Sequence, residues 1–172
     1  GSLKCWGDNT YGQLGIGSTT NQNTPQLVNL GVVRTAISVS LGNKYTCVIL
    51  DNGELKCWGL NYYGQLGTLP PLVSHNTPQP VVNIAPGLLA ESISVGGSHT
   101  CATFDDGSLK CWGKNSYGQV GVNSSNTFVP LPYTLDLEHG QFAISIELGD
   151  DHTCAILDDQ ALKCWGQGGY EG

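Results

Sequence analysis

The chain has 172 residues, of which 12% are charged, and its 14 acidic and 7 basic residues give a formal net charge of −7. A chain with so few cations lacks the basic patch that nucleic acids and anionic membranes require, so neither is expected as a partner. No apolar run approaches the roughly 18 residues that span a bilayer, which argues against membrane insertion. The sequence contains no Met, and we therefore expect it to be part of a longer translation product.

A segment with the sequence Leu-Lys-Cys-Trp-Gly occurs four times and marks an internal repeat. Its Cys-Trp-Gly triplets begin at positions 5, 57, 111 and 164, so that successive copies lie 52, 54 and 53 residues apart. A period of about 50 residues predicts one small sheet per repeat, because such a sheet buries its apolar face only against a neighbouring repeat. We expect a single array over residues 1–172, with units at approximately 5–56, 57–110 and 111–163 and a terminal partial unit at 164–172.

The first complete unit, residues 37–67, indicates the secondary structure. Short runs of β-branched or alternating residues are separated by Gly, Asn and Asp, and no stretch keeps the helical period for long. A further candidate strand precedes each unit, near Pro25 and near Pro78. Because proline lacks the N–H that a sheet ladder needs, this strand belongs at an edge. The chain is therefore predicted to be all-β, with about four strands per repeat, as in a propeller blade.

The segment 46–59 predicts a β-hairpin closed by the three-residue loop 51–53. Gly53 stands where such a loop needs a positive φ. The ladder counted outward from this loop places Cys47 opposite Cys57 at a non-hydrogen-bonded pair, where Cα atoms come closest. The two sulfur atoms are then within disulfide reach.

The same ten-residue separation recurs in two further cysteine pairs, and we predict one cross-strand disulfide in each hairpin: Cys47 with Cys57, Cys101 with Cys111, and Cys154 with Cys164. Zinc is the competing interpretation, but metal-binding cysteines usually come in close pairs, whereas these pairs face each other on a ladder. No metal site is therefore predicted. Structural disulfides place a protein in an oxidising compartment, most simply outside the cell.

Two further positions carry hypotheses about covalent links. Cys5 aligns with the second cysteine of each hairpin, but the chain has no residue ten positions upstream of it. We therefore expect Cys5 to be unpaired or to bond another chain. Asn123 begins the sequon Asn-Ser-Ser, which makes it a candidate site for an N-linked glycan.

Two longer motifs recur in phase with the cysteines. A block of the form Trp-Gly-x-Asn-x-Tyr-Gly-Gln-(Leu/Val)-Gly stands at 6–15, 58–67 and 112–121, and a Gly-x-x-His-Thr motif stands at 96–100 and 149–153. In these motifs the sequence resembles the regulator-of-chromosome-condensation repeat family. The resemblance implies a β-propeller, usually of seven four-stranded blades with about 50 residues each. About three periods then correspond to a partial ring or an open arc.

The chain departs from the family pattern in two features that bear on function. The hairpin cysteines are not a feature of the intracellular members, so they indicate a secreted branch. The last copy of the block decays, with Gly168 in place of Asn and Glu171 in place of Gly. We expect a terminal cap or a junction there.

Side chains that could carry chemistry have simpler structural interpretations. His99 and His152 occupy equivalent places and Tyr45 fills that place in the first unit, which favours packing or hydrogen bonding over catalysis. The repeated Trp residues are expected to pack between blades rather than to stack a ligand or absorb light. The Asp pairs at 105–106 and 158–159 lie at hairpin tips, where Asp serves the turn. No catalytic, cofactor-binding or metal-binding residue is predicted, so we expect a non-enzyme.

Unpaired strand edges and the partnerless Cys5 favour self-association. The first hypothesis is an extracellular or cell-surface structural protein whose copies associate head to tail, such as a subunit of a filament, appendage or matrix. The alternative is a fragment of a secreted propeller that acts as an adhesion or ligand-binding module. A guanine-nucleotide exchange factor is a remote third hypothesis, because family likeness alone is a weak argument for function.

Overall fold

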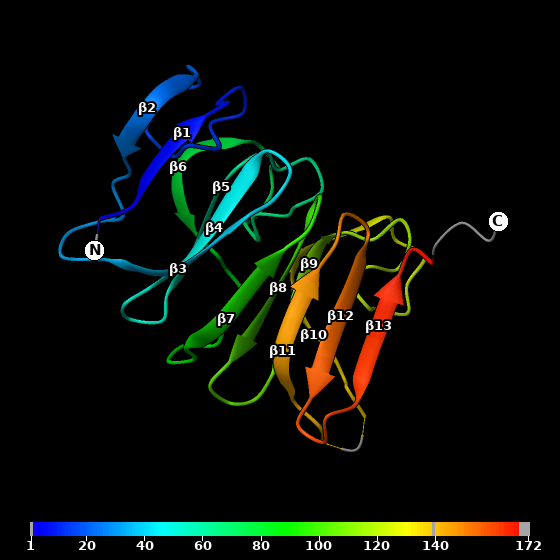
Figure 1. Cartoon of the computed structure of the whole chain (residues 1–172). Coiled ribbons are helices and arrows are strands. Elements are labelled where there is room, and N and C mark those ends of the chain that lie inside the picture. The colour runs from blue at the N-terminus through cyan, green and yellow to red at the C-terminus, as the bar shows by residue number, and fades with distance from the viewer. Residues whose placement is uncertain (1, 139, 169–172) are drawn as a thin grey trace.

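A computed structural model of the chain describes residues 2–138 and 140–168, and all regular structure in them is β (Figure 1). Residues 169–172, which complete the expected terminal unit and include Glu171, lie outside the described residues. The strands are β1 (Lys4–Gly7), β2 (Gln22–Leu27), β3 (Ala36–Leu41), β4 (Tyr45–Leu50), β5 (Leu55–Gly59), β6 (His75–Pro80), β7 (Ala90–Val95), β8 (His99–Phe104), β9 (Leu109–Lys114), β10 (Phe128–Thr134), β11 (Ala143–Leu148), β12 (His152–Leu157) and β13 (Leu162–Gly166).

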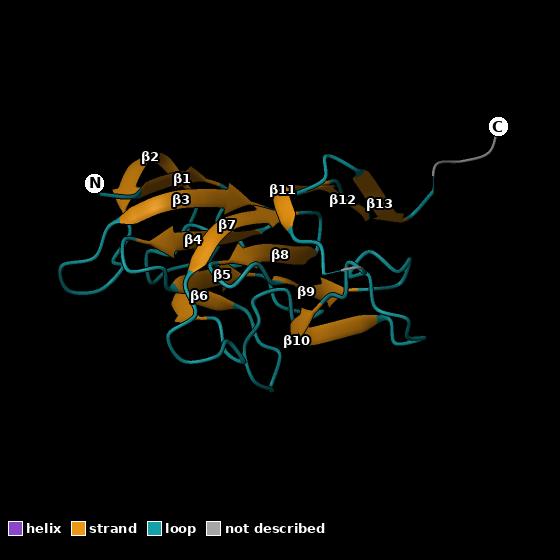
Figure 2. Cartoon of the chain, turned by 90° about the horizontal axis from the view of Figure 1, so that it is seen from below, coloured by secondary structure: helices purple, strands orange, loops and turns teal. Residues whose placement is uncertain are grey.

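Thirteen strands in this part of the chain form four antiparallel sheets. The first sheet has the order β3-β4-β5-β6, the second β7-β8-β9-β10 and the third β11-β12-β13, and an N-terminal pair consists of β1 and β2. Within the second sheet the strands follow one another from β7 to β10 (Figure 2). The innermost strands β3, β7 and β11 contact each other in series, so the sheets form an open arc of propeller blades.

Each hairpin has the register that its loop predicts. Between β4 and β5, Ile49 pairs with Leu55 and Cys47 pairs with Cys57. Gly53 in the loop has a φ of 75°, a conformation that glycine adopts without steric cost. The other two hairpins repeat this register at their cysteine pairs.

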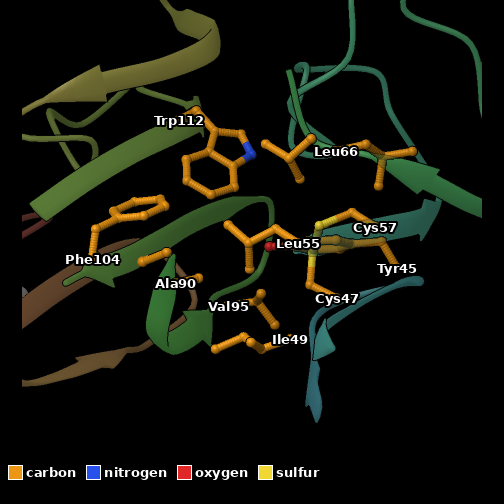
Figure 3. Packing of buried hydrophobic residues seen from close by; sticks show 12 residues of the cluster. Tyr45, Cys47, Ile49, Leu55, Cys57, Leu66, Ala90, Val95, Phe104 and Trp112 are labelled. Atoms are coloured by element: carbon orange, nitrogen blue, oxygen red, sulfur yellow. A yellow bond between two sulfur atoms is a disulfide. The ribbon is translucent and has the colours of Figure 1, made fainter. Parts of the chain in front are cut away.

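The core lies between neighbouring sheets rather than within one sheet. One cluster joins Ile49 and Leu55 of the first sheet to Val95, Phe104 and Trp112 of the second sheet. Figure 3 shows these side chains meeting from the two sheets, beside the disulfide of the first hairpin. Because each sheet buries its apolar face against the next, the array is stabilised by contacts between repeats, as the repeat pattern predicts.

Candidate interaction site at the open sheet edge

The recurring Trp-Gly-x-Asn block folds into a loop that contacts the next sheet. In the second block, the amide of Leu66 donates to Asn61 Oδ1 at 3.1 Å and the amide of Tyr63 donates to Gln65 Oε1 at 3.0 Å. Gly67 ends the loop with a φ of 65°, and a Cβ there would lie 3.0 Å from the indole nitrogen of Trp112. The block therefore needs its Asn, Gln and final Gly to hold one loop shape against a tryptophan.

Each junction between sheets is centred on one backbone carbonyl. The carbonyl oxygen of Gln65 accepts hydrogen bonds from Trp112 Nε1 and from Thr100 Oγ1, both at 2.9 Å. The arrangement is repeated by Trp58 and Thr46 at Gln13 and by Trp165 and Thr153 at Gln119. The prediction that Trp packs between blades is confirmed for Trp58 and Trp112, which are fully buried. The sequence signalled the repeated Trp and Gln, but not that the acceptor is the main-chain oxygen.

The position shared by Tyr45, His99 and His152 also links sheets. Tyr45 donates its hydroxyl hydrogen to the carbonyl of His99 at 2.6 Å, and His99 Nε2 lies 2.8 Å from Thr153 Oγ1. Tyr45 and His99 are buried and His152 is exposed. These contacts support a packing and hydrogen-bonding role for Tyr45 and His99.

The protonation of His99 follows from its contacts. The Thr153 hydroxyl donates to the carbonyl of Gln119 at 2.9 Å, so its oxygen accepts from the Nε2–H of His99. Nδ1 of His99 is buried and has no hydrogen-bond partner among the described residues. Burial lowers the pKa of His99 to about 4, although the nearby Asp151 carboxylate acts in the opposite direction. This imidazole is therefore neutral at physiological pH.

Aspartates at the hairpin tips stabilise turns, as expected. Asp105 Oδ1 accepts the amide hydrogen of Leu89 at 3.0 Å, and its own amide donates to the carbonyl of Leu89. Asp158 makes the same pair of bonds with Phe142. Each tip is thus attached to the entrance of the innermost strand. In the part of the chain that the structure describes, no group of three or more His, Cys, Asp or Glu side chains is placed to hold a metal ion.

Three disulfides join the hairpin strands, with Cα–Cα distances of 4.1 Å, at Cys47–Cys57, Cys101–Cys111 and Cys154–Cys164. The first two bridges have no exposed surface. In the third bridge Cys154 is half-buried and Cys164 is exposed. The third bridge is therefore the most accessible to an attacking thiol.

Cys5 is a free thiol beside an apolar groove. Its strand, β1, lies near the N-terminal end of the arc (Figure 1). The groove has a volume of about 510 Å³, and its lining includes the apolar side chains of Leu3, Trp6, Val39 and Leu41. Trp6 is 60% exposed, whereas Trp58 and Trp112 are fully buried and Trp165 is half-buried. Burial raises the pKa of the Cys5 thiol. Cys5 and the groove together form the candidate interaction site.

The groove exists because β1 pairs with β2 alone. In the first and second sheets, the strands equivalent to β1 also pair with an inner strand through a cysteine. The inner edge of β1 has no such strand among the described residues. The main-chain groups of that edge therefore have no strand partner in the described part of the chain.

Two remaining sequence hypotheses concern a glycan and the membrane. Asn123 lies in the loop between β9 and β10 and is exposed, so an enzyme could reach it. Across residues 2–138 and 140–168, no helix has the length and apolar character needed to cross a membrane.

Known proteins share both the repeat and the fold. Ultraviolet-B receptor UVR8 of Arabidopsis thaliana is 30% identical over 166 residues, which cover 96% of this chain and 37% of the receptor. The crystal structure of human WBSCR16 superposes with a TM-score of 0.85 at 20% identity, covering 97% of this chain and 44% of that chain. Yeast RCC1 (Prp20), solved with Kap60 bound, superposes with a TM-score of 0.81 at 24% identity, covering 97% and 38%.

The chain spans less than half the length of each of these three relatives. The family model for the regulator of chromosome condensation (RCC1) repeat matches residues 1–49, 52–103 and 106–156. The second match contains β5, β6, β7 and all of β8 except its last residue. One family repeat thus supplies two outer strands of one sheet and two inner strands of the next. On these matches and this propeller-type fold, the chain belongs to the RCC1 repeat family.

Proposed function

We propose that the protein is a non-catalytic, protein-binding structural module of the extracellular space or cell surface that self-associates through its open edge. The observation that carries this proposal is the apolar groove beside the free thiol of Cys5. An unpaired strand edge next to apolar surface favours strand addition by a partner. The three hairpin disulfides support an oxidising environment, and exposed Asn123 is the glycan site that we propose for that environment.

The partner that fits the groove best is a second copy, bound head to tail. Strands β1 and β13 contain the same Lys-Cys-Trp-Gly segment, so they hold equivalent places in a blade. In the complex that we propose, β13 separates from β12. Strand β1 of the next copy then pairs with β12 in its place, with β2 beside it. The blade then has four strands, and Cys5 stands opposite Cys154. A repeated contact of this kind is heterologous and generates a filament when it does not close.

The covalent step is a thiol–disulfide exchange. The Cys5 thiolate attacks Cys154, a Cys5–Cys154 bond forms, and Cys164 leaves as a thiolate that takes up the proton Cys5 lost. One thiol is consumed and one is released, so no oxidant is needed. The accessibility of the third bridge supports this route. Because burial raises the pKa of Cys5, exchange accelerates as the pH rises above neutrality.

Non-reducing electrophoresis and disulfide mapping test the proposal. Purified protein, concentrated and incubated at mildly alkaline pH, should form covalent oligomers that reduction dissolves. Mass spectrometry should identify a Cys5–Cys154 peptide joining two copies and a free Cys164 thiol. The Cys5→Ser variant, with its three intramolecular bridges intact, should form no covalent oligomer. A wild-type protein that stays monomeric with Cys5 as its reactive thiol would contradict self-association, and a Cys5–Cys5 link would contradict the strand arrangement.

A ligand-binding segment of a larger secreted propeller is the second candidate function. It is supported by the finding that the chain spans less than half the length of each of the three relatives. In that case the inner strands beside β1 come from the same polypeptide. A longer native protein that has Cys5 bonded within its own chain would favour this function over self-association.

A further inference from the structure

A second groove lies between the second and third sheets, at the end of the array where the hairpin tips lie. It has a volume of about 640 Å³, within the range of ligand pockets. One wall has the exposed apolar side chains of Phe142 and Ile144, and the other carries the exposed carboxylates of Glu91, Asp105 and Asp106. This second groove is separate from the site at β1.

Comparison between repeats shows that one of the carboxylates, Glu91, is specific to the second unit and that another, Asp106, is replaced by an amide in the first unit. Aligned on the strand register, Glu91 corresponds to Ile37 of the first unit and to Ile144 of the third. Asp106 corresponds to Asn52 in the first hairpin tip and to Asp159 in the third. An apolar residue and an amide thus serve the same fold at these places. The charges of Glu91 and Asp106 are therefore not required to form the blade.

In the first unit, the aspartate of the hairpin tip has an arginine as its neighbour. Asp51 lies 3.9 Å from the guanidinium of Arg34. In the second unit Leu88 stands where the first has Arg34, just before the residue that bonds the tip aspartate. Among the described residues, no ion pair involves Glu91, Asp105 or Asp106. The second tip thus has more negative charge than the first and no arginine of its own.

We propose that this second groove binds an arginine-bearing, apolar-flanked segment of a partner protein. The guanidinium lies among the three carboxylates, and an adjacent apolar side chain packs on Phe142 and Ile144. Asp105 and Asp106 each use Oδ1 for a backbone amide, of Leu89 and Ser108 respectively, which leaves Oδ2 free to accept. A guanidinium with its planar set of donors matches such spread acceptors better than a compact ion does. The net charge of −7 favours the approach of a basic segment.

Fluorescence anisotropy with two labelled peptides tests this inference. The probe is an octapeptide that alternates arginine and leucine, and the matched peptide has glutamine in place of each arginine. Only the arginine peptide should bind saturably, and binding should weaken with added salt. Equal binding of the two peptides, or no saturable binding at low salt, would overturn the inference.

Two variants use residues that the chain itself has at equivalent places, so folding should be kept. Glu91→Ile and Asp106→Asn should each raise the Kd about two- to fivefold, as expected for the loss of one partly exposed ion pair. Glu138→Gln, at a residue that does not line the groove, removes one negative charge and should change the Kd less than about twofold. An equal effect of Glu138→Gln would show attraction by net charge alone and would overturn a defined site. Because Cys5→Ser leaves this groove intact, the outcome is independent of self-association.

Discussion

A single main-chain carbonyl oxygen at each junction explains why Gln, Trp and Thr recur together in the repeats, although they lie far apart in the sequence. The oxygen of Gln65 is reached by Trp112 and Thr100 from the neighbouring sheet. An indole N–H or a hydroxyl that is buried without a partner costs about 1–3 kcal/mol. The Gln carbonyl is therefore what permits burial of Trp at this position. The tryptophan supplies apolar area, and the carbonyl satisfies its only donor.

His99 makes the junction between the second and third sheets sensitive to acid. Its buried Nδ1 would carry an unpaired proton if the ring were charged. The pKa of about 4 in the folded protein lies below the ordinary value of about 6.5 for an unfolded chain. A histidine with a lowered pKa gives stability that is complete above pH 6.5 and is lost as the pH falls toward 4.

The variant His99→Tyr should remove this part of the acid sensitivity. Tyr45 shows that a tyrosine at the equivalent place donates to a carbonyl across the junction. Between pH 6.5 and 4, the free energy of unfolding of the wild type should fall further than that of the variant, by on the order of 3 kcal/mol. Urea denaturation at several pH values measures the difference, in which the carboxylates common to both proteins cancel. Parallel pH curves would show that His99 does not titrate as described.

At the scale of elements, the loops depend on glycine for two different reasons. Gly67 and Gly118 both have left-handed backbone conformations, with φ of 65° and 78°. A Cβ at Gly67 would lie 2.8 Å from Val81 and 3.0 Å from Trp112, whereas a Cβ at Gly118 would meet nothing within 4 Å. The two positions therefore separate backbone strain from crowding.

Alanine substitutions at these two glycines should differ in cost. Gly118→Ala should lower the free energy of unfolding by about 1–2 kcal/mol, the penalty of a left-handed conformation. Gly67→Ala should lower it by a further 1–3 kcal/mol or so, because Trp112 is fully buried and cannot move aside. Chemical denaturation of both variants measures the difference. Equal costs would mean that the loop shifts to accommodate the methyl group.

The hairpins could be predicted from sequence because their determinants are local. The loop 51–53 fixes the register, and the register places Cys47 opposite Cys57, as the structure confirms. The contacts between sheets join residues about 30 to 55 positions apart, and composition alone does not specify their geometry. The sequence does contain a sign of the second groove, because Glu91 stands where the other two units have isoleucine. The sequence alone did not show that Glu91 and Phe142 line the same groove, because the two residues belong to different units.

For the whole molecule, the three disulfides determine how strongly the stability of the fold depends on an oxidising environment. A bridge that closes a loop of this length contributes about 2–3 kcal/mol by the chain-entropy model. Three such contributions are comparable with the total stability of a typical domain, about 5–15 kcal/mol. The reduced protein should therefore lie near the limit of folding. This dependence is the physical reason for expecting an oxidising compartment.

Reduction should act in two stages that follow burial. Cys154–Cys164 is reached without unfolding, because Cys164 is exposed, whereas the other two bridges are fully buried. In a Cys5→Ser background, mild reductant should release two thiols first and four more only as the chain unfolds. Full reduction should lower Tm by about 15–30 °C for a chain of this size, as followed by circular dichroism with thiol counting. If Tm changed by only a few degrees, strand pairing and packing would suffice, and the bridges would no longer argue for an extracellular location.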